Sequence, residues 1–272
     1  MKRSLFLRAA AAVCAVVLGG CSLLPSFRTP EEIRAAEEAA QASRAENEAR
    51  IDPTAMESAP LVFHRELSNS QGTVLALYSV SLPQFDDTGV KSQSFQRINR
   101  RFQDERDALD ADCDSFFAQT KQSLGEGWDA LTEEGDPASI NVAYTVLRAP
   151  AGYLCVRFDY EMRVNGQTDY YSKAAVFLLD NGWELDLPTL LGSDYEKVSA
   201  MLLEDVLDWC GENGVTVDDP EALALSDLED GYALTATAIW FYTKPFQLSN
   251  RDGTRYAVRI PLTDYFPYLT LQ

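Results

Sequence analysis

From residue 61 onward, the hydrophobic and polar positions follow patterns that predict strands and helices in turn. Residues 61–67 and 73–82 read as two strands, and the polar stretch 68–72 between them predicts a turn. Along residues 91–124 the apolar positions recur mostly at steps of three and four, which predicts a long helix with one buried face. That face carries Phe95, Ile98, Phe102, Leu109, Cys113, Phe116 and Phe117.

The middle of the chain predicts a meander of three strands, over residues 140–148, 153–164 and 168–179. An Asn-Gly pair at 165–166 separates the last two strands, and it favours a tight hairpin because both turn positions require positive φ. From residue 154 to 164, apolar and polar side chains alternate. One face of the sheet is therefore expected to be core, and the other to meet water or a partner.

One more helix and one strand pair are expected towards the C-terminus. Ser193 and Glu196 have the spacing of a capping box, which predicts that a helix begins here and runs over 194–209. The final strand pair is expected at 232–243 and 256–260. The residues of the helix that are predicted to face inward are Val198, Leu202, Val206 and Trp209.

Together these elements predict an α+β fold, in which a largely antiparallel sheet is packed on one face by the long helix and the second helix. The folded part is expected to divide into an N-terminal half, residues 61–135, and a C-terminal half, residues 136–272. The two halves are expected to share one sheet.

The first 20 residues have the features of a secretory signal peptide. Three basic residues lie within the first eight, and an uncharged stretch follows over 9–18 that is shorter than the roughly 20 residues of a membrane-spanning helix. The string Leu18-Gly19-Gly20-Cys21 resembles the lipobox of bacterial lipoproteins. We therefore expect residues 1–20 to be removed and Cys21 to carry a lipid that anchors the protein at the extracytoplasmic face of the cell membrane. The alternative is an ordinary signal peptide followed by a chance cysteine.

Residues 21–60 differ in composition from the rest of the chain. They contain a run rich in Ala, Glu and Arg, which are strong helix formers, but few large apolar residues that could be buried. The segment is expected to be an acidic helical or disordered tether between the membrane and the folded part. A coiled-coil partner helix is the alternative, although the segment lacks a heptad pattern of apolar residues.

The charge of the chain restricts its partners. The sequence has 23 Lys and Arg against 42 Asp and Glu, and residues 1–20 hold three of the bases and no acid. The mature chain therefore keeps 20 bases against 42 acids, a net charge of −22. Such a chain repels phosphate backbones and anionic lipid surfaces, which argues against nucleic acid as a partner and leaves cationic partners or simple solubility.

Cysteine usage predicts neither a disulfide framework nor a metal site. Besides Cys21, the mature chain has only Cys113, Cys155 and Cys210, which allow at most one disulfide and one free thiol. No C-x-x-C spacing occurs, so a structural zinc site is not expected, and no cofactor is implied. Asn250-Arg251-Asp252-Gly253 is similar to a fragment of a calcium loop but lacks the further acids of such a loop, so a turn is expected there.

Two strings resemble the extracellular domain of RsiV-type anti-sigma factors. Residues 177–191, FLLDNGWELDLPTLL, are similar to that family's pattern of a strand, an Asp-x-Gly turn and L-x-L-x-D-L-F. Residues 239–249, IWFYTKPFQLS, with Gly253 and the run VRIP at 258–261, are similar to its ending, F-x-P-Y-x-I, Gly, V-x-I-P-Y. Leu191 stands where that family usually has Phe, and Phe246 where it has Tyr.

The resemblance covers roughly residues 70–270 and implies an extracytoplasmic α+β module for ligand binding or sensing. In RsiV-type proteins the module binds lysozyme, a cationic enzyme, and in some peptidoglycan deacetylases a similar module accompanies the catalytic domain. No binding residue is carried over from the family to this chain.

No catalytic residue is expected. A Ser-His-Asp or Cys-His site would have to use His64, the only histidine, and nothing near it in the sequence suggests a nucleophile. Carboxylate pairs of the glycosidase type are too numerous among 42 acids to single out. Asp159 and Glu161 alternate with Arg157 and Arg163, for which cross-strand ion pairs are the first expectation.

The candidate ligand-binding residues are acidic and lie in two short clusters before the final strand pair. They are Asp218, Asp219, Glu221, Asp227, Glu229 and Asp230. A solvated loop is one interpretation, and a docking surface for a cationic protein is the other.

The expected function is that of a membrane-anchored, extracytoplasmic binding or sensing lipoprotein that captures a cationic, lysozyme-like protein or a cell-wall component such as peptidoglycan. Two alternatives remain: a cell-wall hydrolase or deacetylase accessory protein, and a structural envelope lipoprotein without a soluble ligand.

Overall fold

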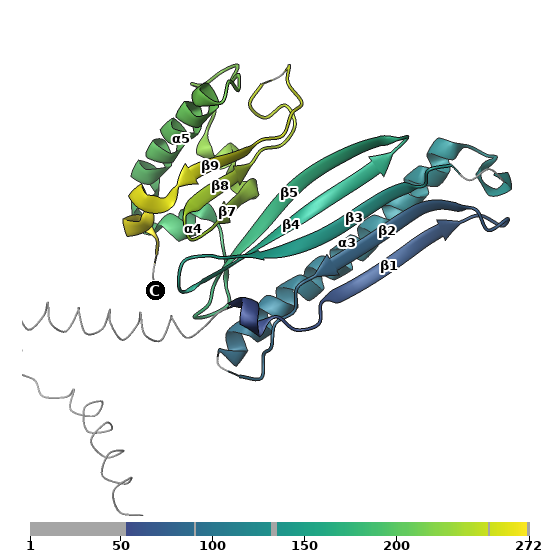
Figure 1. Ribbon diagram of the computed structural model, residues 1–272, viewed down its shortest axis with the longest axis horizontal. Helices are drawn as coiled ribbons and strands as arrows, with labels where there is room; N and C mark the ends of the chain where they lie inside the picture. Colours follow the sequence, from purple (N-terminus) through teal and green to yellow (C-terminus); the bar gives the residue numbers. More distant parts are fainter. Residues whose placement is uncertain (1–52, 90, 132–134, 250, 271–272) are drawn as a thin grey trace, which may run out of the picture. The chain divides into compact units, whose positions relative to one another are not determined.

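The computed structural model describes residues 53–89, 91–131, 135–249 and 251–270 (Figure 1). These residues form two β-sheets and two long helices, so the predicted α+β class is confirmed. The signal peptide, Cys21 and the tether up to residue 52 lie outside the described residues. Their roles stay predictions.

The first sheet has six strands that lie side by side in chain order. All neighbours are antiparallel except β2 and β3, which are parallel. A parallel pair requires a long crossover, and the long helix α3 supplies it. The strands are β1 (Leu61–Ser68), β2 (Val74–Leu82), β3 (Ala138–Leu147), β4 (Tyr153–Val164), β5 (Gln167–Leu178) and β6 (Glu184–Leu185).

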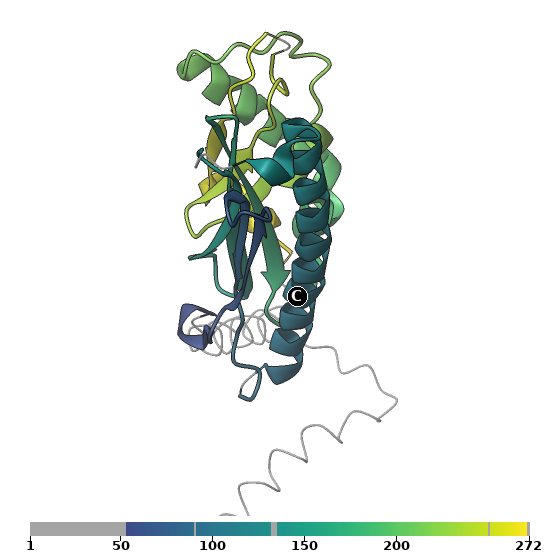
Figure 2. The same ribbon diagram turned by 90° about the vertical axis from the view of Figure 1, so that its right-hand side faces the viewer.

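Helix α3 (Ser92–Leu124) runs along one face of this sheet, as Figure 2 shows. Its predicted apolar face is buried there, with Phe116 only partly so. The ring of Phe102 lies 5.8 Å from that of Phe158 and 5.4 Å from that of Phe177, both in edge-on geometry. Full burial of one such ring stabilises the fold by roughly 1.5–3 kcal/mol, so α3 and the sheet hold each other in place.

The hairpin of β4 and β5 takes part in both hydrophobic cores of the protein. Its turn is the predicted Asn165-Gly166 pair, with φ values of 53° and 74°. Because neighbouring side chains point to opposite faces, Leu154 and Phe177 lie in the core under α3. Cys155 lies in the second core.

The second sheet is antiparallel and has three strands, β7 (Tyr232–Leu234), β8 (Ala238–Tyr242) and β9 (Ala257–Pro261). It is preceded by α4 (Leu187–Leu191) and α5 (Tyr195–Glu212), and α5 packs against β9. Val198, Leu202 and Val206 face this core as predicted, together with Cys210, and Trp209 is partly buried against it. The three remaining cysteines are buried free thiols.

Several short 3₁₀ turns connect these elements. They are η1 (Pro53–Met56), η2 (Trp128–Ala130), η3 (Gly192–Asp194), η4 (Leu225–Asp227), η5 (Glu229–Gly231), η6 (Leu262–Asp264) and η7 (Phe266–Tyr268).

Four details differ from the sequence-based expectation. The helices lie on two separate sheets instead of one. The predicted strand over 232–243 is two strands. The prediction of a capping box at Ser193 and Glu196 was wrong, because α5 begins after Asp194 without a side-chain cap. The last residues of the predicted tether join the fold, since Glu57 forms a β-bridge with Phe85.

Candidate functional site

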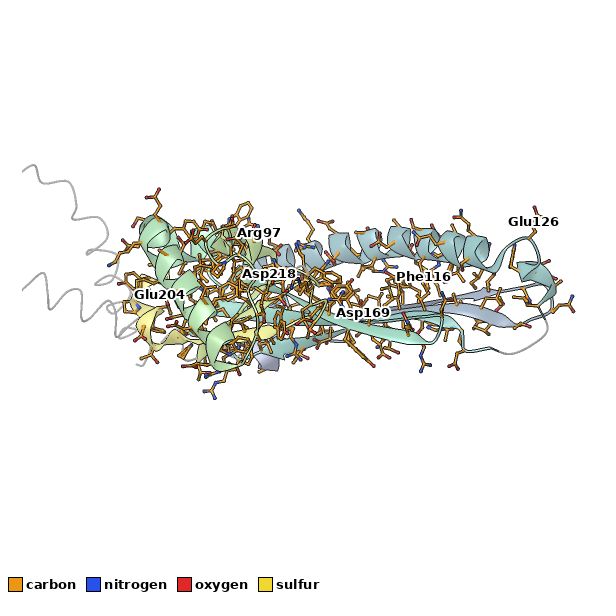
Figure 3. The ribbon with its side chains drawn as sticks, turned by 90° about the horizontal axis from the view of Figure 1, so that it is seen from above. Arg97, Phe116, Glu126, Asp169, Glu204 and Asp218 are labelled. Carbon is orange, nitrogen blue, oxygen red and sulfur yellow. The ribbon has the colours of Figure 1, made fainter. Side chains whose placement is uncertain are left out.

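Three of the predicted acidic residues lie around one pocket. Asp218, Asp219 and Asp227 line a cavity of about 200 Å³, and Phe246 lines it from the loop after β8. The three acids come from the segment between α5 and β7, so the two loops build the pocket together. We call it the acidic pocket, and Figure 3 labels Asp218 in this part of the chain.

Each carboxylate of the acidic pocket also has a local hydrogen bond. Asp219 accepts the backbone N–H of Ala222 at 3.1 Å, and Asp227 accepts that of Ala224 at 3.0 Å. Asp218 accepts the hydroxyl of Ser249 at 3.1 Å. These bonds fix where the carboxylates lie, while all three side chains belong to exposed residues.

Phe246 adds an apolar surface beside the carboxylates. Its side chain is 61% exposed, and its backbone has a left-handed φ of 59°. A β-carbon on Gly253 would lie 2.9 Å from the tip of the Phe246 ring, so a side chain at position 253 would push the ring aside. The ring therefore packs closely over Gly253 while most of it faces solvent.

The other three predicted residues do not line the acidic pocket. Glu221 is exposed. Glu229 accepts a hydrogen bond from the phenol of Tyr195. Burial and this bond raise the pKa of Tyr195 to about 12. The bond links the start of α5 to η5. The side chain of Asp230 lies outside the described residues.

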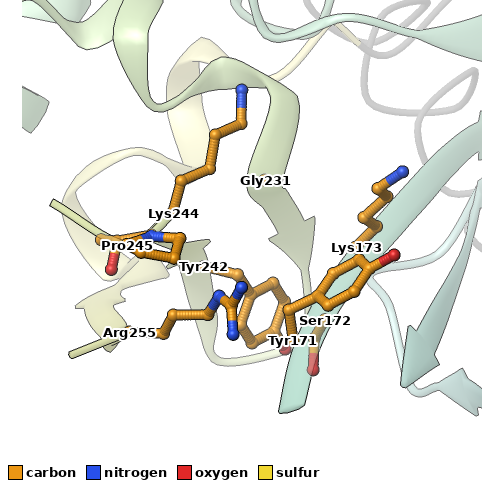
Figure 4. A pocket seen from close by; sticks show the side chains of 9 residues that line it. Tyr171, Ser172, Lys173, Gly231, Tyr242, Lys244, Pro245 and Arg255 are labelled. Carbon is orange, nitrogen blue, oxygen red and sulfur yellow. The ribbon is translucent and has the colours of Figure 1, made fainter. Parts of the chain in front are cut away.

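The larger cleft has the opposite charge, and the sequence did not point to it. It has a volume of about 480 Å³ and includes Lys173 on β5, Lys244 after β8 and Arg255 before β9 (Figure 4). Tyr171 and Tyr242 contribute aromatic walls. We call it the basic cleft.

The tyrosines of the basic cleft stay protonated at neutral pH. Burial raises the pKa of Tyr171, although Arg255 opposes the rise. Burial also raises the pKa of Tyr242, and the nearby Arg157 opposes it. Both phenols can therefore donate hydrogen bonds, and neither adds negative charge to the cleft.

The two pockets share a loop. Lys244 and Pro245 line the basic cleft, and the next residues, Phe246 and Gln247, line the acidic pocket. The Gln247 side chain accepts the N–H of Lys244 at 2.7 Å and donates to the backbone of Asp227. One short segment therefore lies between the basic cleft and the acidic pocket.

The only histidine lies away from both pockets. His64 Nδ1 is 2.8 Å from the Ser79 hydroxyl on the adjacent strand, a neighbour that the sequence alone did not reveal. In the described part of the chain no carboxylate bonds to this pair, and the His64 side chain is exposed on the edge strand β1. The pair lacks the third group that orients the base of a catalytic triad.

The described residues contain neither a cluster of metal ligands nor a membrane-spanning helix. Across residues 53–270 outside the gaps, no three His, Cys, Asp or Glu side chains converge to hold a metal ion. Within the same residues, no helix combines the length and the apolar character that crossing a bilayer requires.

The fold defines an α+β protein with two sheets, and an acidic pocket and a basic cleft lie at its surface. No family model matches the sequence, and no curated protein matches it. Among solved structures the chain is similar to a member of the DUF3298 family from Bacteroides fragilis NCTC 9343, at 12% identity and a TM-score of 0.49. That match covers 79% of this chain and 96% of the other.

A second similar structure is a DUF3298 family protein from Pseudomonas aeruginosa PAO1, at 12% identity and a TM-score of 0.45. It covers 78% of this chain and 93% of the other. The resemblance to RsiV-type ectodomains stays a prediction.

Proposed function

We propose that the protein is a binding lipoprotein, anchored through Cys21 at the extracytoplasmic face of the cell membrane, that captures a cationic protein such as lysozyme. It acts as a binder and not as an enzyme. The observation that carries the proposal is the acidic pocket, which Asp218, Asp219 and Asp227 line together with the exposed ring of Phe246.

This pocket has the chemistry that receives a lysine or arginine side chain. The aliphatic stem of such a side chain packs on an aromatic ring, and its charged head reaches nearby carboxylates. A net charge of −22 on the mature chain adds a long-range attraction, which raises the rate of encounter with a cationic protein. Lysozyme is proposed as the cationic ligand because of the resemblance to RsiV-type ectodomains.

The capture is tested by titrating purified lysozyme against the full chain at low ionic strength. The triple variant Asp218→Asn, Asp219→Asn, Asp227→Asn removes three charges and keeps the side-chain oxygens that accept the local hydrogen bonds. At roughly 0.5 kcal/mol for each exposed pair, the dissociation constant rises about tenfold.

A matched control removes three charges elsewhere. The control is the triple variant Asp104→Asn, Asp112→Asn, Glu126→Gln. Its sites lie on α3 or just after it, and Figure 3 places Glu126 well apart from Asp218. Lysozyme should bind this control as it binds the unaltered chain. Equal weakening by both triple variants would mean that total charge acts alone, and no binding to any of them would remove lysozyme as the ligand.

The anchor is tested separately in the native host. The unaltered chain should fractionate with membranes and carry an acylated Cys21 by mass spectrometry. Cys21→Ala should release the protein from the membrane fraction. An unacylated N-terminus on the native product contradicts the anchor without touching the binding claim.

A further inference from the structure

The basic cleft is notable because it lies in a strongly acidic chain. Acids outnumber bases by 42 to 23 in the sequence, yet Lys173, Lys244 and Arg255 line this one cleft and none of its nine lining residues is acidic. Side chains of one sign gathered in a concave site focus their field inside it. The cleft therefore attracts anions that the rest of the surface repels.

Arg255 is held in a fixed orientation at this site. Its Nη1 donates to the Asp169 carboxylate and, at 3.0 Å, to the carbonyl of Tyr170. Its guanidinium lies 5.3 Å from the centre of the Tyr171 ring. Among the described residues both bonds use Nη1, which leaves Nε and Nη2 on the planar group to bind a ligand.

Lys173 is positioned by aromatic rings. Its ammonium lies 5.3 Å from the centre of the Tyr160 ring and 5.8 Å from that of Tyr171. These two rings stack on each other at 4.4 Å with an angle of 7° between them. The lysine is thus oriented by cation–π contact, and among the described residues it forms no ion pair that a ligand would have to break.

Two carboxylates contact residues of the cleft, and each is held in place by a partner. Asp159 pairs with Arg157 at 3.0 Å and accepts the Ser172 hydroxyl at 2.7 Å. Asp169 pairs with Arg255. These contacts hold the walls of the cleft in place beside Arg255 and Ser172.

A smaller pocket that Lys173 also borders is acidic in part, but its acids are paired too. Glu105 lies 2.8 Å from Arg101 Nη1, and Glu184 lies 2.6 Å from Arg101 Nε. Arg101 therefore competes with Lys173 for both carboxylates.

We propose that the basic cleft binds a small ligand that carries a carboxylate on a ring-shaped, partly apolar body. The cleft volume of about 480 Å³ falls in the range of small-molecule sites. The planar fork of Arg255 matches a carboxylate, and Tyr242 and Pro245 supply apolar walls for the body of the ligand. A large polyanion is disfavoured, because parts of it outside the cleft meet the acidic surface.

Three probes separate the features of this ligand. N-acetylmuramic acid is a sugar ring that bears a carboxylate, N-acetylglucosamine has the same ring without it, and inorganic phosphate is an anion without a ring. Each is titrated against the full chain by NMR or calorimetry. The proposal expects saturable binding of N-acetylmuramic acid and at least about tenfold weaker binding of the other two.

Two variants place the binding in the cleft. Lys173→Gln removes one positive charge from the cleft. It should raise the dissociation constant for N-acetylmuramic acid about tenfold. Lys197→Gln removes a similar lysine from α5, whose ammonium lies 5.5 Å from the Tyr268 ring, and should leave the affinity unchanged. Both variants lose one positive charge at an exposed lysine that lies over aromatic rings, two rings for Lys173 and one for Lys197.

The proposal is overturned if N-acetylmuramic acid does not bind saturably, or if phosphate or N-acetylglucosamine binds as tightly as N-acetylmuramic acid. It is also overturned if Lys197→Gln weakens the binding of N-acetylmuramic acid as much as Lys173→Gln does. The cleft shares no lining residue with the acidic pocket, so these results are independent of lysozyme binding.

Discussion

Leu154 and Cys155 are neighbours on β4 and are both completely buried, yet their side chains belong to two different hydrophobic cores. Leu154 faces α3, and Cys155 faces the core of the second sheet. Strand β4 can serve both because successive side chains of a strand point to opposite faces. The two cores are therefore linked through the β4–β5 hairpin.

Truncating Leu154 should destabilise the whole folded part. Leu154→Ala leaves a cavity between α3 and the sheet, and such losses cost about 2–5 kcal/mol in free energy of unfolding. Val62→Ala is the control, because Val62 is 65% exposed and its loss should cost less than about 0.5 kcal/mol. Urea unfolding followed by circular dichroism measures both. A cost for Leu154→Ala that equals the control would refute the core assignment.

Two glycines with similar φ values separate backbone strain from steric clash. Gly182 has a φ of 72°, and a β-carbon there would meet the backbone oxygen of Ser94 at 2.3 Å. Gly166 has a φ of 74° with open space around it. Gly166→Ala should cost only the strain of the left-handed conformation, on the order of 1–2 kcal/mol. Gly182→Ala should cost more, because the turn after β5 must also move away from α3, and equal urea midpoints would show that the contact with Ser94 is loose.

Stability should decline in alkaline solution. Burial raises the pKa of Cys155 to about 12, and it also raises the pKa of Tyr78 and Tyr160 above their ordinary values. In the unfolded chain a thiol ionises near pKa 8.5 and a phenol near about 10. Above these values the unfolded state binds fewer protons than the folded state, so the free energy of unfolding falls as pH rises.

The pH effect is measured as the urea midpoint between about pH 8 and pH 11 at constant ionic strength. Cys155→Ala removes the thiol and should reduce the slope in the lower part of this window, where the phenols have not yet begun to ionise. A midpoint that stays flat or rises with pH would contradict the burial of these groups.

The sequence predicted the elements whose local signals agree with their packing. The hairpin at Asn165-Gly166 needs two positive φ values, which this pair adopts at low cost, so its position was predictable. Helix α3 was predictable because one apolar face continues over its length. In both cases a short-range pattern and the tertiary contacts favour the same structure.

The split of residues 232–243 into β7 and β8 had no such signal. The turn at Thr235 contains neither Gly, Pro nor Asn, and it is closed by the threonine side chain, which donates to the Ala238 carbonyl at 2.9 Å and accepts its N–H at 3.1 Å. The capping box failed because the 3₁₀ turn at Gly192–Asp194 delays the start of α5. Spacing alone cannot distinguish a cap from a tight turn before it.

Three of the six predicted acidic residues line one pocket, and the sequence did not predict the basic cleft. Asp218, Asp219 and Asp227 line one pocket because the segment between α5 and β7 folds against the loop after β8. Lys173 and Arg255 are separated by 82 positions in the chain, and only the folding of the second sheet beside β5 brings them to one cleft. No local spacing encodes such a site.

If the acidic pocket captures a cationic protein electrostatically, the affinity for lysozyme must depend on salt. Between ionic strengths of about 20 mM and 300 mM, the dissociation constant of the unaltered chain should rise at least tenfold. The Asp218→Asn, Asp219→Asn, Asp227→Asn variant should start weaker and rise less steeply, while the Asp104→Asn, Asp112→Asn, Glu126→Gln control should follow the unaltered chain. An affinity that does not change with salt, or identical slopes for all three proteins, would contradict the account.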